Sequence, residues 1–519
     1  MEAKILLLGA SAVGAEAIKN LVLPGVGHVT VADGGNVTAA DARTNFFVTA
    51  ASVGSPRAPV VLATLLELNP DVRGSALVEP LADTLARGAD FFRGFTLILG
   101  TQLTDSEAGA VEAVAGGVPL VLARSYGLLG TVRSAVTEHR IVESKPMGVV
   151  RDLRIATPFP RLRAAADAVD MAAIDDLTYV HVPFPLLLIK ALDAWRAAHG
   201  GAAPKTSAEK AAERAGVQAE LQAMVAARRA VTEKSRVNFD EALAVASNAG
   251  VPARIPDDCA DVLADDAAHA GLTAASAPFW FIVRALSDFV AAHGALPLPG
   301  DLPDMTATTE LYIALQRAYE AQAAEEAAEV AAQVAALVAE VHAPADTVPA
   351  ADIAYACKHA QFLRVIRMHS VAGELAWDAT TVEGVQEALA EVREDAQAPI
   401  LWYLALRGAY AVAAATGRLP GSGAADKPDD LAADARRVHA AITDALAAAG
   451  IDAALAARVT LDHATEVVRY GGAELHTTAA LLGGIASQEA IKLLTAQFTP
   501  ANNTFVYNGI AGVSTTLRL

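Results

Sequence analysis

The chain has 519 residues, of which 53% are hydrophobic, and this length is typical of about three domains with sizeable cores. Its formal net charge of −19 argues against nucleic acid and anionic membranes as partners, because both are bound through basic patches. No apolar run approaches the roughly 18 residues of a membrane span. Two isolated cysteines, Cys259 and Cys357, argue against a disulfide framework or a zinc site. We therefore expect a cytoplasmic or nuclear protein.

Short apolar strands alternate with helical stretches from residue 1 to about 150. Five apolar runs in this part predict strands, at Lys4–Leu8, His28–Ala32, Ser75–Val78, Phe95–Leu99 and Pro119–Ala123. This βαβ alternation predicts a parallel sheet with helices on both faces. After Tyr126, the run Leu128–Val136 is typical of an antiparallel strand added to that sheet.

The strand signal nearly disappears between about 175 and 455, where apolar residues recur at helical spacing. The helical runs are Ala208–Val231, Asp240–Ala246, Phe279–Ala292 and Thr309–Val341. From about 475 the α/β pattern returns. A helical run at His476–Leu494 is broken by Gly483 and Gly484, and two predicted strands follow it, at Thr504–Tyr507 and Val513–Leu517. We therefore predict one α/β domain, residues 1–174 and 456–519, interrupted by a mostly helical insertion at 175–455.

A glycine-containing loop lies between the first strand and the helical run Ala12–Leu23. It reads Gly9-Ala-Ser-Ala-Val-Gly14, and Asp33 follows the second strand, 19 residues beyond Gly14. This is the layout of a dinucleotide- or ATP-binding βαβ unit, except that Ser11 stands where a middle glycine lets the backbone approach a phosphate. The loop predicts a pseudo-enzyme subunit that keeps the frame of a nucleotide site. An NAD-dependent oxidoreductase, with Asp33 on the ribose, is the alternative.

Three stretches of the chain resemble the ubiquitin-like-protein activating enzymes of the ThiF/MoeB-like superfamily. They are Gly9–Gly14 with Lys19–Gly27, the helical run Leu482–Lys492, and Asn502–Gly509. Ten further short motifs occur in order along the chain, at Asn45–Phe47, Ser52–Gly54, Thr101–Leu103, Arg124–Leu128, Pro158–Pro160, Pro204–Thr206, Pro278–Trp280, Leu302–Met305, Phe362–Arg364 and Arg469–Gly471. The ordered set resembles the regulatory, non-catalytic subunits of the Nedd-type activating enzymes. The resemblance implies a Rossmann-like adenylation domain with a mixed, mainly parallel sheet and a large helical insertion.

Active members of the superfamily adenylate a small ubiquitin-like protein with ATP and magnesium, and the resemblance assigns their nucleotide groups to positions here. The loop glycines Gly9 and Gly14 and the acid Asp33 are kept. The remaining positions are changed: Ser11 for a glycine, Gly35 for an acid, Asp41 for an asparagine, Thr44 for an arginine, Arg57 for a lysine and Gln102 for a magnesium-binding aspartate. Because phosphoryl chemistry depends on metal and cationic support, these losses together leave no credible adenylation site. We therefore expect the isolated chain to bind neither ATP nor NAD. The alternative is a self-sufficient adenylating enzyme, which would need the lost residues.

The resemblance implies a heterodimer with a catalytic subunit that holds ATP, magnesium and the acceptor cysteine, and that acts on a ubiquitin-like modifier. The helical insertion would then correspond to a catalytic-cysteine domain that lacks the cysteine. The segment Asp304–Gln316 matches a stretch that the family uses for contact with the catalytic subunit, and its interface candidates are Asp304, Met305, Tyr312, Leu315 and Gln316. An equally good interpretation is that Tyr312 and Leu315 are core residues of a helix.

Each of the two cysteines could in principle be a nucleophile. Cys357 lies in Tyr-Ala-Cys-Lys-His, and basic neighbours of this kind lower a thiol pKa. Cys259 follows two aspartates, and acidic neighbours of this kind raise a thiol pKa. The favoured interpretation of both is a small buried side chain, and we expect neither to form a thioester.

Overall fold

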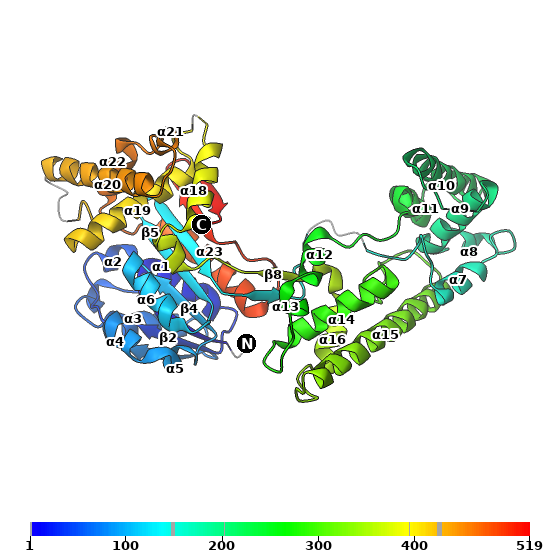
Figure 1. The fold of residues 1–519 in the computed structure, drawn as a ribbon, viewed down its shortest axis with the longest axis horizontal. Helices are drawn as coiled ribbons and strands as arrows, with labels where there is room; N and C mark the ends of the chain where they lie inside the picture. The colour runs from blue at the N-terminus through cyan, green and yellow to red at the C-terminus, as the bar shows by residue number, and fades with distance from the viewer. Residues whose placement is uncertain (1–2, 147–150, 202, 394, 423–427) are drawn as a thin grey trace. The chain divides into compact units, whose positions relative to one another are not determined.

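The computed structural model describes residues 3–146, 151–201, 203–393, 395–422 and 428–519. The chain forms two compact units (Figure 1). The first comprises Met1–His139 and Val365–Leu519, and the second comprises Arg140–Arg364. The chain therefore leaves the first unit once and returns to it, as the α/β pattern that disappears and returns predicts.

One sheet of eight strands organises the first unit, in the order β10-β9-β6-β5-β4-β1-β2-β3. Its strands are β1 (Lys4–Leu8), β2 (His28–Ala32), β3 (Arg73–Leu77), β4 (Leu97–Thr101), β5 (Leu120–Tyr126), β6 (Leu129–Ala135), β9 (Thr504–Asn508) and β10 (Val513–Leu517). Neighbours from β3 to β5 are parallel, whereas β6, β9 and β10 are added antiparallel. The predicted mixed, mainly parallel sheet is confirmed, including the two strands from the end of the chain.

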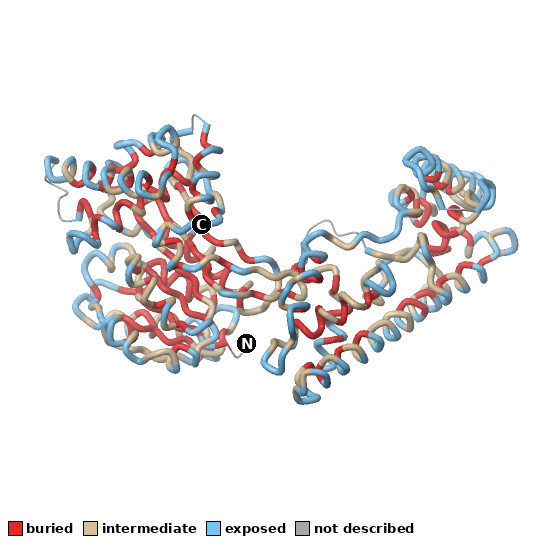
Figure 2. Tube along the Cα trace, in the orientation of Figure 1, coloured by how far each residue is buried: buried red, intermediate tan, exposed pale blue. Residues whose placement is uncertain are grey.

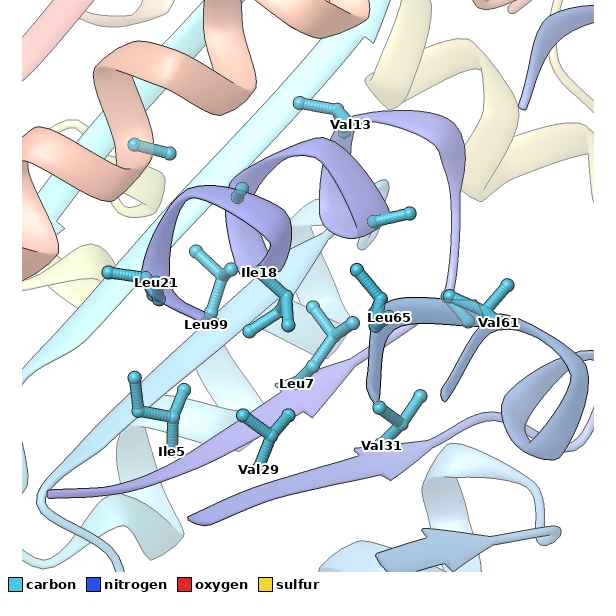
Figure 3. Packing of buried hydrophobic residues seen from close by; sticks show 14 of the residues in the cluster. Ile5, Leu7, Val13, Ile18, Leu21, Val29, Val31, Val61, Leu65 and Leu99 are labelled. Atoms are coloured by element: carbon cyan, nitrogen blue, oxygen red, sulfur yellow. The ribbon is translucent and has the colours of Figure 1, made fainter. Parts of the chain in front are cut away.

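One face of the sheet is covered by three helices, α1 (Ala12–Val22), α3 (Arg57–Leu66) and α23 (His476–Thr495). Alternate residues of the central strands are buried beneath them. Figure 3 shows Ile5, Leu7 and Val31 of the strands directed toward Ile18 of α1 and Leu65 of α3. The side chains between them point to the other face, because successive residues of a strand alternate. Burial on both faces explains why these strands are continuous apolar runs, and Figure 2 shows the buried residues following them.

The other face of the sheet is covered by α4 (Leu81–Ala86), α5 (Gly88–Phe92), α6 (Asp105–Ala115) and α17 (Val371–Leu375). Phe92, Val111 and Val371 pack there against Leu6 and Ile98 of the sheet. Helix α17 comes from the part of the chain that has returned from the second unit. Both faces of the sheet are therefore completed by residues distant in sequence.

Helix α23 runs without interruption through Gly483 and Gly484, so the break predicted there is wrong. The reason is close packing on α1: a Cβ added at Gly483 would lie 2.6 Å from Cβ of Glu16 and 2.8 Å from N of Ala17. The glycine pair therefore marks a close approach of two helices and not a turn.

Helix α17 and four further helices that the sequence analysis assigns to the insertion belong to the first unit. The four are α18 (Ala379–Glu391), α19 (Pro399–Thr416), α20 (Pro428–Ala448) and α21 (Ala453–Ala456), and they pack with α22 (Leu461–Tyr470), which lies in the predicted closing part. Their apolar side chains form one core with Leu129 of β6, Val506 of β9 and Leu517 of β10. The units consequently divide at residues 139/140 and 364/365 instead of the expected 174/175 and 455/456. A helical pattern shows that a helix has an apolar face but not which surface that face covers.

The second unit is helical. Its helices are α7 (Pro160–Asp167), α8 (Asp176–Val180), α9 (Phe184–Ala198), α10 (Ser207–Ala227), α11 (Val237–Val245), α12 (Asp257–Leu263), α13 (Asp266–His269), α14 (Pro278–His293), α15 (Thr309–Glu340) and α16 (Ala350–Lys358). The four helical runs predicted here are confirmed as α10, α11, α14 and α15. Strands β7 (His139–Ile141) and β8 (Arg364–Ile366) pair in a small sheet that the sequence analysis did not predict. Across the described ranges, the structure contains no helix long and apolar enough to cross a bilayer.

The adjacent glycines of α23 offer a matched test of this packing. Gly483→Ala places its methyl group against the α1 backbone, so we expect it to lower the free energy of unfolding by about 1–3 kcal/mol. Gly484→Ala meets only Nδ2 of Asn20 at 4.0 Å and gains helix propensity, so it should be neutral or stabilising by up to about 1 kcal/mol. Urea unfolding of both variants measures the difference. Equal effects would contradict the close approach of α1 and α23.

Candidate functional site

The glycine loop joins the end of β1 to the start of α1. Gly9 has φ +88°, and a Cβ there would lie 2.7 Å from the carbonyl oxygen of Thr101. Ser11 is the N-cap of α1: its Oγ accepts from N–H of Gly14 at 3.2 Å and donates to Oγ1 of Thr101 at 3.1 Å. Thr101 donates in turn to the carbonyl oxygen of Gly9 at 2.6 Å. Ser11, expected to crowd a phosphate, therefore ties the loop to β4 and caps the helix.

The first backbone N–H groups of α1 bind a carboxylate from the far end of the chain. Ala12 N–H donates to Oε2 of Glu474 at 3.0 Å, and Val13 N–H donates to Oε1 at 3.1 Å. Helix N-termini of this kind hold phosphate in nucleotide-binding proteins. Burial raises the pKa of the Glu474 carboxyl, and the charge of Asp41 raises it further, against the lowering effect of the two N–H donors.

Asp33 at the end of β2 is only 8% exposed, and both of its carboxylate oxygens accept hydrogen bonds. Its Oδ2 accepts from Ala10 N–H at 2.7 Å, and its Oδ1 accepts from Gly35 N–H at 2.7 Å. Arg57 adds a two-pronged ion pair, Nε to Oδ2 at 2.9 Å and Nη2 to Oδ1 at 3.2 Å. A Cβ at Gly35 would lie 2.8 Å from Nη2 of Arg57, so the absence of a side chain at 35 makes room for the guanidinium.

Arg57 begins α3 and holds two carboxylates at once. Burial opposes its charge, but the hydrogen bonds and charges of Asp33 and Asp41 raise the pKa of Arg57 overall. Asp41 lies 3.3 Å from Nη1 of Arg57 and accepts from N–H and Oγ1 of Thr38 at 2.7 and 2.8 Å. Thr44 donates to the carbonyl oxygen of Ala40 at 3.2 Å, within the short helix α2 (Asp41–Thr44). The cation at 57 therefore neutralises the chain's own acids.

Gln102 follows β4 with φ +56° and pairs with the backbone of the neighbouring strand. Its Nε2 donates to the carbonyl oxygen of Ser125 at 2.8 Å, and its Oε1 accepts from Ser125 N–H at 2.8 Å. An aspartate at this position could accept but not donate. Gln102 thus ties the end of β4 to β5 with both ends of its amide.

Of the nine positions that the sequence analysis assigned to the degenerate nucleotide site, the structure links seven, namely Gly9, Ser11, Gly14, Asp33, Gly35, Asp41 and Arg57, through the loop and the Asp33 contacts. Thr44 and Gln102 bond elsewhere, to the carbonyl oxygen of Ala40 and to the backbone of Ser125. Two further residues were missed. Glu474 lies 462 residues from Ala12, and no local pattern links the two. Asn45 is buried and donates to the carbonyl oxygen of Ala10 at 3.4 Å, and its place in the Asn45–Phe47 motif was the available signal.

Both cysteines are buried in the second unit. Burial raises the pKa of Cys259 to about 12 and that of Cys357 to about 12. The Cys259 thiol donates to the carbonyl oxygen of Ala360 at 3.2 Å. The pKa of Cys357 is raised and not lowered, because burial dominates and the charge of Glu326 adds to it. The interpretation of both as small buried side chains is confirmed.

The segment Asp304–Gln316 leads into α15. Leu315 is 1% exposed and packs in the core of the second unit, so for this residue the core interpretation is confirmed. Met305 is half-buried against the same core, Tyr312 is half-buried and Asp304 is exposed. Gln316 donates to Glu320 at 2.9 Å along the helix. Of the five candidates, all except Leu315 present some surface to solvent.

A sheet with a glycine loop ahead of its first helix defines an α/β domain of the nucleotide-binding type, here with its polar groups paired among themselves. The model of the ThiF family matches residues 1–519. Regulatory subunits of the NEDD8-activating enzyme E1 from Xenopus laevis and Drosophila melanogaster are each 34% identical to it. They match over 521 and 524 residues, 100% of this chain and 95% and 93% of those proteins. The Arabidopsis thaliana subunit AXL is also 34% identical, over 100% of this chain and 95% of its own length. The chain belongs to the ThiF family and, within it, to the NEDD8-activating enzyme E1 regulatory subunits.

The pairing of Arg57 with Asp33 can be tested by stability. Arg57→Leu leaves Asp33 buried with only its two backbone donors, so we expect a loss of about 3 kcal/mol in the free energy of unfolding. Arg254→Leu is the matched control, because Arg254 and Asp257 pair with both side chains 79% exposed, and its effect should stay below about 1 kcal/mol. Chemical denaturation compares the two. Similar losses would mean that Arg57 is not a structural partner of Asp33.

Proposed function

We propose that this chain is the regulatory, non-catalytic subunit of a heterodimeric activating enzyme for a NEDD8-like modifier. The relatives that match this chain over 93–95% of their own length are named NEDD8-activating enzyme E1 regulatory subunits. The observation that carries the proposal is the internal pairing of the nucleotide site: Glu474 on the first turn of α1, Arg57 on Asp33, and Gln102 on β5. Groups committed to one another in this way do not stabilise phosphate charge or hold magnesium. ATP, magnesium and the acceptor cysteine then belong to the catalytic partner, and this chain contributes structure.

The sheet unit offers an apolar surface for such a partner beside α23. Phe46 is 76% exposed and stacks on His476 at 6.0 Å, while Leu481 is 42% exposed on the same helix. A groove continues along α23 toward β9 and β10, where Ile485 and Phe505 line it. Grouped exposed apolar side chains are typical of protein interfaces. We propose this face as the main contact with the catalytic subunit, and the exposed part of Asp304–Gln316 as a second one.

Assembly with a catalytic subunit tests this proposal. Phe46→Asp with Leu481→Asp should abolish co-elution with the catalytic subunit and lower modifier thioester formation, because each buried anchor contributes about 1–4 kcal/mol. Leu177→Asp, at a residue 68% exposed in the second unit, is the matched control and should leave assembly unchanged. Size-exclusion chromatography and a thioester gel provide the measurements, with circular dichroism to verify folding.

Two outcomes would count against the proposal. Normal assembly of the folded double variant would place the interface elsewhere. Pyrophosphate exchange with ATP by the isolated chain, in the presence of any ubiquitin-like protein, would make the chain an enzyme in its own right.

A further inference from the structure

A small cavity lies in the first unit, on the face of the sheet that α6 and α17 cover. Its volume is about 30 Å³, which is the space of one water molecule or one small ion. Strands β5 and β6 and helices α6, α17 and α19 all contribute residues to its wall. The cavity therefore lies where the part of the chain that has returned from the second unit meets the part that precedes it.

Three arginine side chains line this cavity, and each is at most 15% exposed. They are Arg124 of β5, Arg133 of β6 and Arg407 of α19. Successive side chains of a strand alternate, so Arg124 and Arg133 reach the cavity while their neighbours Ala123 and Val132 are buried toward α1. A guanidinium is not deprotonated in a protein, so all three side chains are positively charged.

Among the described residues of the wall, two carboxylates face these three charges. Nη1 of Arg124 lies 2.7 Å from Oδ1 of Asp105. Nε of Arg133 pairs with Oε2 of Glu374. Arg407 shares both carboxylates, with Nε 3.4 Å from Oδ2 of Asp105 and Nη1 3.5 Å from Oε1 of Glu374. The wall therefore keeps an excess of one positive charge.

Aromatic rings stabilise two of these cations without neutralising them. The guanidinium of Arg124 lies over the ring of Tyr410 at 4.2 Å, and that of Arg407 lies over Trp377 at 5.3 Å. A contact of this kind is worth less than the cost of burying an ion that has no counter-charge. The surplus charge therefore favours an anion in the cavity.

The wall also offers hydroxyl groups as donors. Tyr410 is 6% exposed, and its hydroxyl makes no hydrogen bond with any residue that the structure describes. The same holds for Oγ1 of Thr131. Burial raises the pKa of Tyr410 and that of Tyr403, so both phenols are neutral at physiological pH and add no negative charge. Surplus positive charge and unpartnered O–H donors are thus found in one small space.

We propose that this cavity binds one small monovalent anion, a halide such as chloride. A space of about 30 Å³ is too small for phosphate or sulfate, and a dianion would reverse the excess charge instead of cancelling it. The bound halide joins α19 to β5 and β6 and so holds the returning part of the chain on the sheet. This inference goes beyond the proposed function, because it requires neither a partner nor a nucleotide. Failure of the assembly experiment leaves it standing, and its own failure leaves assembly untouched.

Thermal unfolding of the full chain in sodium chloride and in sodium gluconate, at equal ionic strength, tests the site. A ligand that binds only the folded chain raises its Tm, so the Tm should be higher in chloride by about 2 °C or more. Arg407→Met removes the surplus charge and leaves Arg124 and Arg133 with one carboxylate each, so this difference should disappear. Arg93→Met is the matched control, because Arg93 is 58% exposed in its ion pair with Asp90. It should keep the full difference.

Crystals of the full chain soaked in sodium bromide locate the anion directly, and an anomalous peak in the cavity is the expected result. Where Arg407→Met does not fold, Tyr410→Phe provides the test. It removes one hydroxyl donor, so the chloride concentration that gives half of the Tm shift should rise about fivefold.

Three results would overturn the proposal. The first is an equal Tm of the unaltered chain in the two salts, and the second is the absence of a bromide peak from the cavity. The third is a chloride effect that persists at full strength in folded Arg407→Met, or at an unchanged chloride concentration in Tyr410→Phe.

Discussion

The first N–H groups of α1 need hydrogen-bond acceptors from outside the helix, and the positive end of the helix dipole favours an anion there. In this chain the anion is the carboxylate of Glu474, 462 residues from Ala12. The requirement of one helix end thereby links the first part of the chain to the last. The same contact fixes the connection between α22 and α23, residues 471–475, and α23 in turn packs along α1. The closing part of the fold and the state of the nucleotide site thus depend on one interaction.

The changed residues of the site are mutually consistent. Gly35 leaves room for the guanidinium of Arg57, and Arg57 neutralises Asp33 and Asp41. Gln102 uses both ends of its amide to tie β4 to β5. These residues are therefore committed to contacts within the fold.

Much of the sheet follows from local sequence pattern. Strands buried on both faces are continuous apolar runs, so β1 and β2 could be placed to the residue, and the loop from Gly9 to Gly14 marked the site. What the sequence could not provide is the pairing of distant residues. Glu474 carries no local signal, α18 to α22 pack on the sheet through faces that look like those of any helix, and Leu315 is buried by neighbours outside its own helix. Gly483 was misinterpreted because close helix packing and a helix break call for the same residue.

The central claim is that the chain's own side chains satisfy the groups a nucleotide would need. Titration of MgATP into the isolated chain, followed by calorimetry, tests it most directly. The account predicts no saturable heat, since Ala12, Val13, Asp33 and Gln102 are all engaged within the protein. Saturable binding of ATP that is lost on Asp33→Asn would contradict it, because Asp33 would then serve the nucleotide and not Arg57.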